Sequence, residues 1–274
     1  MIPFCKASII ISIYKDTVAL NAILSRLNVQ TEKNFEVIIA EDGESSEVAE
    51  YLRVTPFPSL KIKHTTQEDN GWRKMSAVNK AVAKAESEYL IFLDGDCIPH
   101  SRHVETHLAQ QEPGKILTGR RVYLGPFFSK WTRQNPDILN YIENRFLYLL
   151  AIIPLHLDKV KCYELGLRSY LLHKRAKHRH VSIVGCNFSL SMQDMLDVNG
   201  YDENLVGPGA EDDDLAIRLR AMGKSEKSVK FITPTYHLNH KVNRQGSEKN
   251  KEITAESLKN KQFYTLNGID KYLK

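Results

Sequence analysis

Cysteine is scarce in this sequence, and its placement excludes two classes of small domain. The 274 residues contain four cysteines, Cys5, Cys97, Cys162 and Cys186, and no two of them form a CxxC pair. A zinc ribbon needs such pairs and is therefore excluded, and a disulfide framework is disfavoured. We expect reduced thiols, as is usual for a cytosolic protein.

Long apolar runs and strong charge are also missing. No run approaches the roughly 18 apolar residues of a spanning helix. The apolar run Ala7–Ile13 contains two serines and is too short and too polar for a signal peptide. The net charge of +5 is too small to indicate nucleic-acid binding by itself. It is compatible with anionic substrates or an anionic membrane surface. We expect a cytoplasmic chain, and peripheral contact with the inner face of the membrane stays open.

The first half of the chain alternates strand and helix patterns. Hydrophobic residues make up 42% of the sequence and charged residues 26%, as in globular proteins. Expected strands cover Ser8–Ile13, Phe35–Ala40, Leu60–His64 and Tyr89–Leu93, the third near a sheet edge, and expected helices cover Thr17–Leu27, Ser46–Val54 and Ser76–Ala85. This alternation predicts an α/β fold with a doubly wound, mostly parallel sheet flanked by helices.

The second half is less regular. Expected strands cover Ile116–Tyr123, Val181–Ser191 and Val229–Thr233, and expected helices cover Asp137–Ile153, ended by Pro154, Asp212–Met222, ended by Gly223, and a surface tail from Glu248. A basic stretch, Lys159–His180, separates two of these segments. No internal repeat and no Gly/Ser linker is present, which favours one domain.

Acidic residues follow two of the expected strands. Glu41-Asp42 ends one strand, and Asp94-Gly95-Asp96 ends another. Because ligands of such sheets bind beyond the carboxyl ends of the strands, we expect both clusters to face one crevice. Two neighbouring carboxylates repel each other unless a cation lies between them, and Mg²⁺ or Mn²⁺ would satisfy them. A plain turn with solvated carboxylates is the alternative.

A third acidic cluster opens a later helix. Glu211, Asp212, Asp213 and Asp214 are consecutive, more acids than capping of a helix N-terminus requires. One carboxylate aimed into the crevice would serve as a general base. His237, with His240 three residues later, would complete a metal site. A structural or exposed histidine is the alternative.

Together these motifs resemble an inverting glycosyltransferase of family 2 with the GT-A fold. The resemblance rests on an ordered set of motifs: Ser8–Ile13 with Tyr14, Glu41-Asp42-Gly43-Glu44-Ser45, Asn70-Gly71-Trp72-Arg73-Lys74 with Asn79, Leu93–Pro99, Gly185-Cys186-Asn187-Phe188-Ser189, Gly200-Tyr201-Asp202-Glu203, Glu211–Leu215 with Arg218-Leu219, and His237. The second half is similar to chondroitin-type polymerases and β-1,4-galactosyltransferases.

The resemblance implies a role for each site residue. Asp42 would hold the uracil or ribose of a UDP-sugar, in a nucleotide-sugar pocket lined by Ser12, Tyr14, Asp94 and Gly95. Arg73 or Lys74 would contact the nucleotide or its phosphates. Asp96, helped by Asp94, would hold Mn²⁺ or Mg²⁺ with His237 as a further ligand. Asp212 would be the catalytic base, and Glu211 would hydrogen-bond the acceptor or donor.

The segment 126–180 matches no motif of the family. The apolar run Phe146–Ile153 beside basic residues is typical of an interfacial element, and an ordinary packed helix with a solvated basic loop is the alternative. We divide the expected single domain 1–274 into a nucleotide-sugar-binding half (1–125), an acceptor or membrane-proximal insertion (126–180), an acceptor/catalytic half (181–247) and a tail (248–274). Gly207-Pro208-Gly209-Ala210 replaces the Trp-Gly-Gly of galactosyltransferases, so no tryptophan platform is expected there.

The expected activity is metal-dependent transfer of a hexose or N-acetylhexosamine from a UDP-sugar to a glycan or lipid-linked glycan hydroxyl. Bacterial surface polysaccharide synthesis is the expected setting, with no nucleic-acid partner. One alternative is a nucleotidyltransferase, which needs a glycine-rich loop that Ile13-Tyr14-Lys15-Asp16 lacks. The other is a non-catalytic carbohydrate- or membrane-binding module, which would not require the spaced acidic sites.

Overall fold

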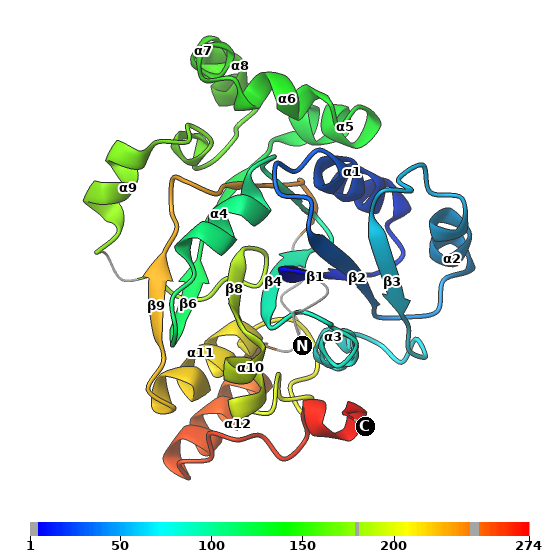
Figure 1. Cartoon of the computed structure of the whole chain (residues 1–274), viewed down its shortest axis with the longest axis vertical. Helices are drawn as coiled ribbons and strands as arrows, with labels where there is room; N and C mark the ends of the chain where they lie inside the picture. Colours follow the sequence, from blue (N-terminus) through cyan, green and yellow to red (C-terminus); the bar gives the residue numbers. More distant parts are fainter. Residues whose placement is uncertain (1–4, 179–180, 242–246, 274) are drawn as a thin grey trace.

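A seven-stranded sheet forms the centre of the molecule (Figure 1). The computed structural model describes residues 5–178, 181–241 and 247–273, so Arg179 and His180 of the basic stretch lie outside the described residues. The strand order is β3, β2, β1, β4, β8, β6, β9. These strands are β1 (Ala7–Ile13), β2 (Phe35–Glu41), β3 (Lys61–Thr65), β4 (Tyr89–Asp94), β6 (Lys115–Thr118), β8 (Phe188–Ser191) and β9 (Ser225–Ser228).

The sheet is mostly parallel, as the sequence predicts. Strands β3, β2, β1 and β4 are parallel neighbours, and β9 is parallel to β6. Only β8 runs antiparallel, between β4 and β6. The edge position expected for the third strand is confirmed. A smaller sheet joins β5 (Cys97–Pro99), β10 (Thr235–His237) and β7 (Arg121–Tyr123) beside the end of β4.

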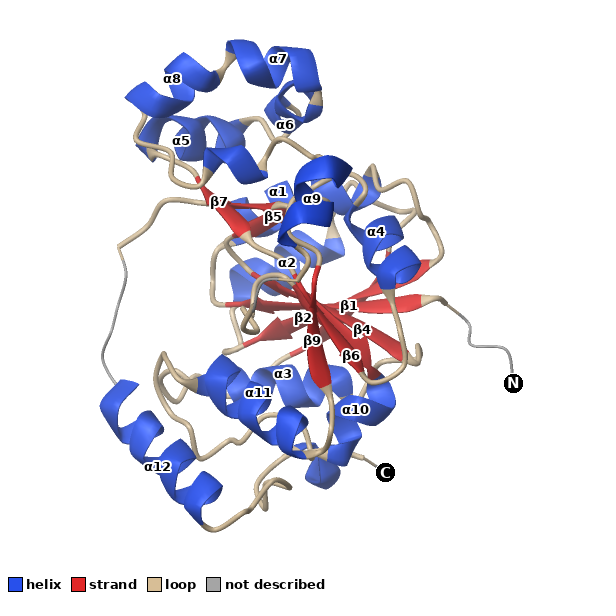
Figure 2. Ribbon diagram, turned by 90° about the vertical axis from the view of Figure 1, so that its left-hand side faces the viewer, coloured by secondary structure: helices blue, strands red, loops and turns tan. Residues whose placement is uncertain are grey.

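Helices cover both faces of the large sheet, so it is doubly wound (Figure 2). Successive side chains of a strand point to opposite faces, and in β1 Ile9 and Ile11 pack with one helix layer while Ile10 packs with the other. The first layer contains α1 (Thr17–Asn28), α2 (Ser46–Arg53) and α4 (His103–Gln110); the second contains α3 (Lys74–Val82), α10 (Met192–Asp197) and α11 (Glu211–Ala221).

The C-terminal tail is helical, as expected. Helix α12 (Ser247–Lys259) lies beside α11, and a short turn of helix, η2 (Ile269–Tyr272), follows it. All four cysteines carry free thiols. Within the described ranges, no helix is both long and apolar enough to span a bilayer.

Short helices build a separate layer above the sheet, at the top of Figure 1. They are α5 (Pro126–Gln134), α6 (Ile138–Glu143), α7 (Arg145–Leu150), α8 (Ile152–Leu157), the turn η1 (Tyr163–Leu165) and α9 (Tyr170–Ala176). The continuous helix expected over Asp137–Ile153 is wrong, because Asn144 caps α7 with its side chain and Ala151 separates α7 from α8. Pro154 lies in the first turn of α8, where its missing N–H costs nothing.

Three expected strands of the second half also need correction. Ile116–Tyr123 splits at Gly119, whose N–H donates to the carbonyl of Asn187 at 2.8 Å, so β6 and β7 enter different sheets. Of Val181–Ser191, only Phe188–Ser191 forms a strand, because the preceding residues bond to the acidic helix and to neighbouring loops.

The expected strand Val229–Thr233 is wrong. Phe231 has φ of 69°, a left-handed conformation that an extended strand cannot contain. Val229 and Ile232 are fully buried, so this apolar run is a core turn between β9 and β10. Burial alone produced the strand-like pattern.

Candidate active site

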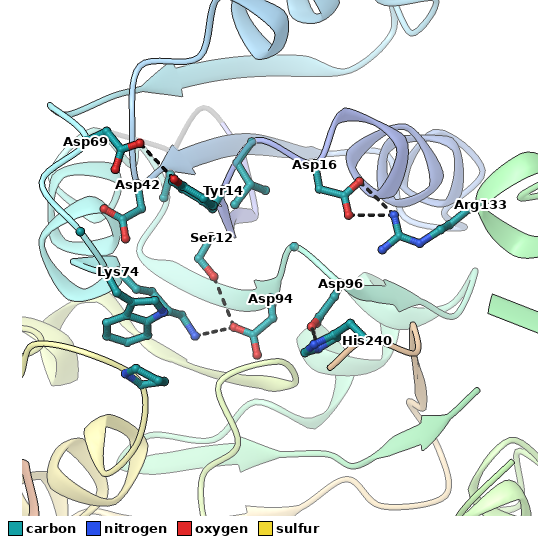
Figure 3. A pocket seen from close by; sticks show the side chains of 16 residues that line it. Ser12, Tyr14, Asp16, Asp42, Asp69, Lys74, Asp94, Asp96, Arg133 and His240 are labelled. Carbon is teal, nitrogen blue, oxygen red and sulfur yellow. Dashed lines mark hydrogen bonds and ion pairs between the residues drawn. The ribbon is translucent and has the colours of Figure 1, made fainter. Parts of the chain in front are cut away.

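A pocket of about 650 Å³ opens at the carboxyl ends of β1, β2 and β4 (Figure 3). Its walls come from segments far apart in the sequence. The lining residues are Ser12, Ile13, Tyr14, Asp16, Ala40, Asp42, Asp69, Gly71, Trp72, Lys74, Asp94, Gly95, Asp96, Arg133, Pro208 and His240. The prediction that Asp42, Asp94 and Asp96 share one crevice is therefore confirmed. Glu41 was expected there too, and this is wrong, because its buried carboxylate turns to His64 Nε2 at 2.8 Å.

The Asp42 carboxylate is fixed by two donors. Gln67 Nε2 donates to Oδ1 at 2.8 Å, and the backbone N–H of Arg73 donates to Oδ2 at 2.7 Å. The Arg73 side chain is exposed and donates to the carbonyl of Asn70. Arg73 therefore positions Asp42 through its backbone, and a contact of its side chain with a nucleotide stays a prediction.

Tyr14 forms the outer wall of the pocket beside Asp42. Its hydroxyl donates to Asp69 Oδ2 at 3.0 Å, and Lys15 Nζ lies 2.7 Å from the same oxygen. The Tyr14 ring is 53% exposed, so a flat face is available to a ligand at this end.

Asp94 is held by Lys74 and Ser12 on the pocket floor. Lys74 Nζ lies 2.5 Å from Asp94 Oδ1, and Ser12 Oγ donates to the same oxygen at 3.3 Å. Burial opposes the charge of Lys74, but the carboxylates of Asp94, Asp212 and Glu211 outweigh it and raise its pKa. Lys74 is therefore a cation that interacts with Asp94 on one side and with Glu211 and Asp212 on the other.

Gly95 allows β1 and the end of β4 to approach each other closely at the floor of the pocket. A Cβ at Gly95 would lie 2.7 Å from the carbonyl oxygen of Ser12 and 2.9 Å from Ile13 Cγ2. Any side chain there would push β1 away from β4. Glycine at this position is therefore needed for the packing of β1 against β4, independently of any backbone contact with a ligand.

Asp96 does not share the partners of Asp94 and contacts two histidines, of which Figure 3 shows His240. Its Oδ2 lies 2.8 Å from His240 Nε2 and 3.3 Å from His237 Nε2. Burial alone would raise the pKa of Asp96, and the hydrogen bonds from His237 and His240 lower it below its usual range. The ligand atoms of these three residues lie within 4.8 Å of one another. Asp94 is not among these three residues, so its role as a metal ligand stays a prediction.

Asp212 lies in the first turn of α11, and its carboxylate is held by Gly185 and Tyr201. The N–H of Gly185 donates to Oδ2 at 2.7 Å, and the Tyr201 hydroxyl lies 3.4 Å from Oδ1. A Cβ at Gly185 would lie 2.9 Å from Oδ1, so a side chain at this position would displace the Asp212 carboxylate. Burial raises the pKa of Asp212 to about 6; Lys74 opposes this rise, and Glu211 and Asp94 add to it. The group is suited to exchange a proton near neutral pH.

The other acids of this cluster have separate partners. Glu211 Oε2 accepts from the backbone N–H of Gly209 at 2.7 Å, which closes the loop before α11. Asp214 is buried and paired with Arg218 at 2.7 Å. Asp213 is exposed. Only Asp212 and Glu211 therefore remain next to Lys74.

Sequence reasoning missed several pocket residues. His240 was noted as a neighbour of His237 but not assigned as a ligand, and the spacing of three was the only signal. Trp72 lines the pocket, as does Pro208, although the motif before Asp212 lacks a tryptophan. Arg133 comes from the segment without family motifs and binds both oxygens of Asp16, at 2.9 and 2.7 Å; no sequence signal pointed to it.

Comparison with known proteins places this geometry in a family. Residues 8–173 match the family described as glycosyl transferase family 2. Residues 168–241 match the family described as N-terminal domain of galactosyltransferase. The first match runs through most of the helical segment 126–180, for which the sequence offered no family motif, and it overlaps the second at residues 168–173. Together the two matches include every site residue described above.

Two relatives support the same assignment. Validoxylamine A glucosyltransferase of Streptomyces hygroscopicus subsp. jinggangensis is 27% identical over 225 residues, covering 79% of this chain and 51% of the relative. Chondroitin synthase of Escherichia coli is 31% identical over 121 residues, covering 43% of this chain and 17% of the relative. The chain thus spans about half the length of the validoxylamine A glucosyltransferase and a smaller part of the chondroitin synthase.

The fold has solved counterparts as well. The mannosyltransferase PcManGT from Pyrobaculum calidifontis, in complex with GDP-Man and Mn²⁺, superposes with a TM-score of 0.58 at 14% identity, covering 92% of this chain and 61% of that one. At this identity the likeness concerns the fold alone. The chain therefore belongs to glycosyl transferase family 2 and has the GT-A fold.

Proposed function

We propose that this chain transfers a hexose or N-acetylhexosamine from a UDP-sugar to a hydroxyl of a glycan or lipid-linked glycan, with inversion at the anomeric carbon. The observation that carries the proposal is the convergence of Asp42, Asp96 and Lys74 on one pocket, with Asp212 held close to Lys74. Bacterial surface polysaccharide synthesis is the setting we propose, in the cytoplasm.

The nucleotide end of the pocket is the wall formed by Asp42 and Tyr14. Asp42 is buried and held by two donors, so its carboxylate is pre-oriented to accept from a base or ribose group. Tyr14 offers a partly exposed ring beside it. The Lys74 ammonium lies deeper in the pocket and would meet the negative charge of a diphosphate.

The residues around Asp96 fit a divalent cation. One carboxylate and two imidazole nitrogens lie within 4.8 Å of one another, and imidazole ligands favour transition metals over Mg²⁺. Asp96, His237 and His240 would therefore hold Mn²⁺ better than Mg²⁺. A cation bound there would offset the charge of the departing nucleoside diphosphate.

Asp212 is the group we assign as general base. Its pKa of about 6 leaves it mostly ionised at neutral pH, yet basic enough to take a proton from an acceptor hydroxyl. The hydrogen bond from Gly185 fixes the carboxylate. Direct attack of the hydroxyl on the anomeric carbon inverts it, so no second carboxylate is needed as a nucleophile.

Two other functions remain as competitors. A non-catalytic binding module has no use for a carboxylate whose pKa is raised toward neutrality beside Lys74. A nucleotidyltransferase would need glycines after β1, where Tyr14, Lys15 and Asp16 stand. Both alternatives predict no release of nucleoside diphosphate from a sugar donor.

A donor screen tests the proposal. The full chain is incubated with a panel of UDP- and GDP-sugars and Mn²⁺, and the release of UDP or GDP is measured with and without glycan acceptors. We expect UDP release from one UDP-hexose or UDP-N-acetylhexosamine. Release from GDP-sugars alone would overturn the donor assignment, and binding of donors without any release would favour the binding module.

A further inference from the structure

The outer surface of α7 and α8 carries an apolar ridge that no part of the described chain covers. The ridge consists of Phe146 and Leu150 in α7 and of Ile153 and Leu157 in α8, and the spacing of four residues within each helix places its two members on one face. Their side chains are 69%, 62%, 72% and 76% exposed. In Figures 1 and 2 both helices lie at the far end of the helical layer, away from the sheet.

The inner surface of the same helices is packed normally. Tyr148 and Leu155 are buried in the main core. The layer is tied to α1 by Arg26, which pairs with Glu143 and hydrogen-bonds Asn140. The ridge is therefore a fixed feature of a folded element. A helix that is apolar on both its inner and outer faces needs a non-aqueous neighbour outside.

Charge around the ridge indicates which neighbour. No Asp or Glu occurs from Arg145 to Leu157. Arg145, Lys159 and Lys161, the basic residues that flank the ridge in the sequence, are all exposed. The nearest acid, Asp158, is engaged, since its two oxygens accept from the N–H groups of Phe127 and Phe128, each at 2.9 Å.

We infer that the ridge inserts into the interface of an anionic lipid bilayer, with Arg145, Lys159 and Lys161 contacting the headgroups. An apolar face bordered by Lys and Arg is the pattern of a peripheral membrane element. A second copy of the chain is disfavoured as the occupant, because two such rims would bring like charges together.

The helical layer that carries the ridge also borders the pocket. Helix α5 is the first helix of this layer, and its Arg133 lines the pocket through Asp16. A lipid-linked acceptor would then reach the donor from the membrane side, a consequence that rests on the proposed function. The membrane contact itself does not.

The test is flotation of the full chain with vesicles of phosphatidylcholine alone or with about one third phosphatidylglycerol. We expect binding to the anionic vesicles that weakens as salt is raised, since such charges are screened within about 10 Å at 0.1 M. The variant with serine at Phe146, Leu150, Ile153 and Leu157 should lose binding by about tenfold or more. Serine at Val54, Leu258 and Leu266, which are 58%, 49% and 81% exposed elsewhere, should not change it.

Charge-matched variants locate the basic contact. Serine at Arg145, Lys159 and Lys161 should weaken binding more than serine at Lys174, Arg175 and Lys177, which removes the same charge from the region of α9. Figures 1 and 2 place α9 apart from α7 and α8. Equal losses from the two triple variants would overturn the assignment of the headgroup contact to the ridge.

Other results would overturn the insertion itself. No flotation with anionic vesicles would do so, as would unchanged flotation of the ridge variant. Light scattering that shows a dimer of the wild-type chain but not of the ridge variant would assign the ridge to a second copy. If the fourfold variant does not fold, Ile153→Asp is measured instead. No sugar donor is used, so failure of the proposed transfer would leave these results intact.

Discussion

The sheet and the helical layer above it contain similar apolar side chains but place them differently. In β1, every isoleucine is buried, because helices cover both faces of the sheet. In α7 and α8, Phe146, Ile153 and Leu157 are more than two thirds exposed. The sheet thus buries its apolar side chains within the chain, whereas α7 and α8 leave an apolar ridge exposed.

The polar residues differ in the same way: those of the active site are partly or fully withdrawn from solvent, whereas those beside the ridge are exposed. In the candidate active site, Asp96 contacts two histidines, and burial raises the pKa of Asp212. In the helical layer, Arg145, Lys159 and Lys161 lie in solvent. Perturbed groups in a cleft indicate chemistry, and solvated cations around an apolar ridge indicate docking. The following predictions test whether catalysis belongs to the cleft and docking to the ridge.

Chelation should have the largest effect. If Asp96, His237 and His240 hold the cation, EDTA should abolish UDP release and Mn²⁺ should restore it. Flotation with vesicles should persist in EDTA, because the ridge needs no metal. Full activity in chelator would contradict the assigned site. Asp96→Asn, measured by calorimetry, should weaken Mn²⁺ and donor binding together.

Replacing the base should come next. Asp212→Asn keeps the hydrogen bond from Gly185 but removes basicity, so turnover should fall by roughly 10²–10⁴-fold. Donor affinity should change little. The matched control is Asp213→Asn, an exposed neighbour, which should stay near wild type. If the control loses more turnover than Asp212→Asn, the assigned position of the base is wrong.

Breaking the anchor of the helical layer should cost stability. Arg26 is 1% exposed, so Glu143→Gln leaves a buried cation without its counter-charge, at a cost of about 3–5 kcal/mol in the free energy of unfolding. Urea unfolding measures it. Glu50→Gln, which breaks the exposed Glu50–Arg53 pair, should leave the midpoint unchanged. Equal shifts in both variants would contradict the role of Arg26 as a buried anchor.

The pH profile should report Asp212. A base must be ionised to accept a proton, so kcat/KM should fall about tenfold per pH unit below about 6, the pKa of Asp212. Above that pH the profile should be level until other groups titrate. The low-pH limb should be missing from the residual activity of Asp212→Asn. A limb that persists in this variant assigns the titration to another group.

The smallest effect is expected on the stability of the ridge variant. Serine at Phe146, Leu150, Ile153 and Leu157 removes no buried contact, so the unfolding midpoint should stay close to wild type. Leu155→Ala, at a buried position of α8, should lower the free energy of unfolding by about 2–5 kcal/mol. A large loss from the ridge variant would mean that the ridge packs within the chain.

The sequence predicted the local and periodic features of this protein. Runs such as Ser8–Ile13 and Phe35–Ala40 are strands because their β-branched side chains fit a sheet buried on both faces. The alternation with helices then requires a parallel sheet, and this places Asp42 and Asp94 at one edge. The division into halves and tail stays a prediction, although both halves supply strands to one sheet.

The tertiary structure alone decided everything that depends on a distant partner. The apolar run Val229–Thr233 is a turn because Phe231 adopts a left-handed conformation, and no local pattern encodes that. Asp94 and Asp96 are two residues apart, yet one turns to Lys74 and the other to His240. Arg133 enters the pocket from a segment without motifs. Periodicity records which face of an element is apolar, but only packing decides which groups meet and which apolar face stays uncovered.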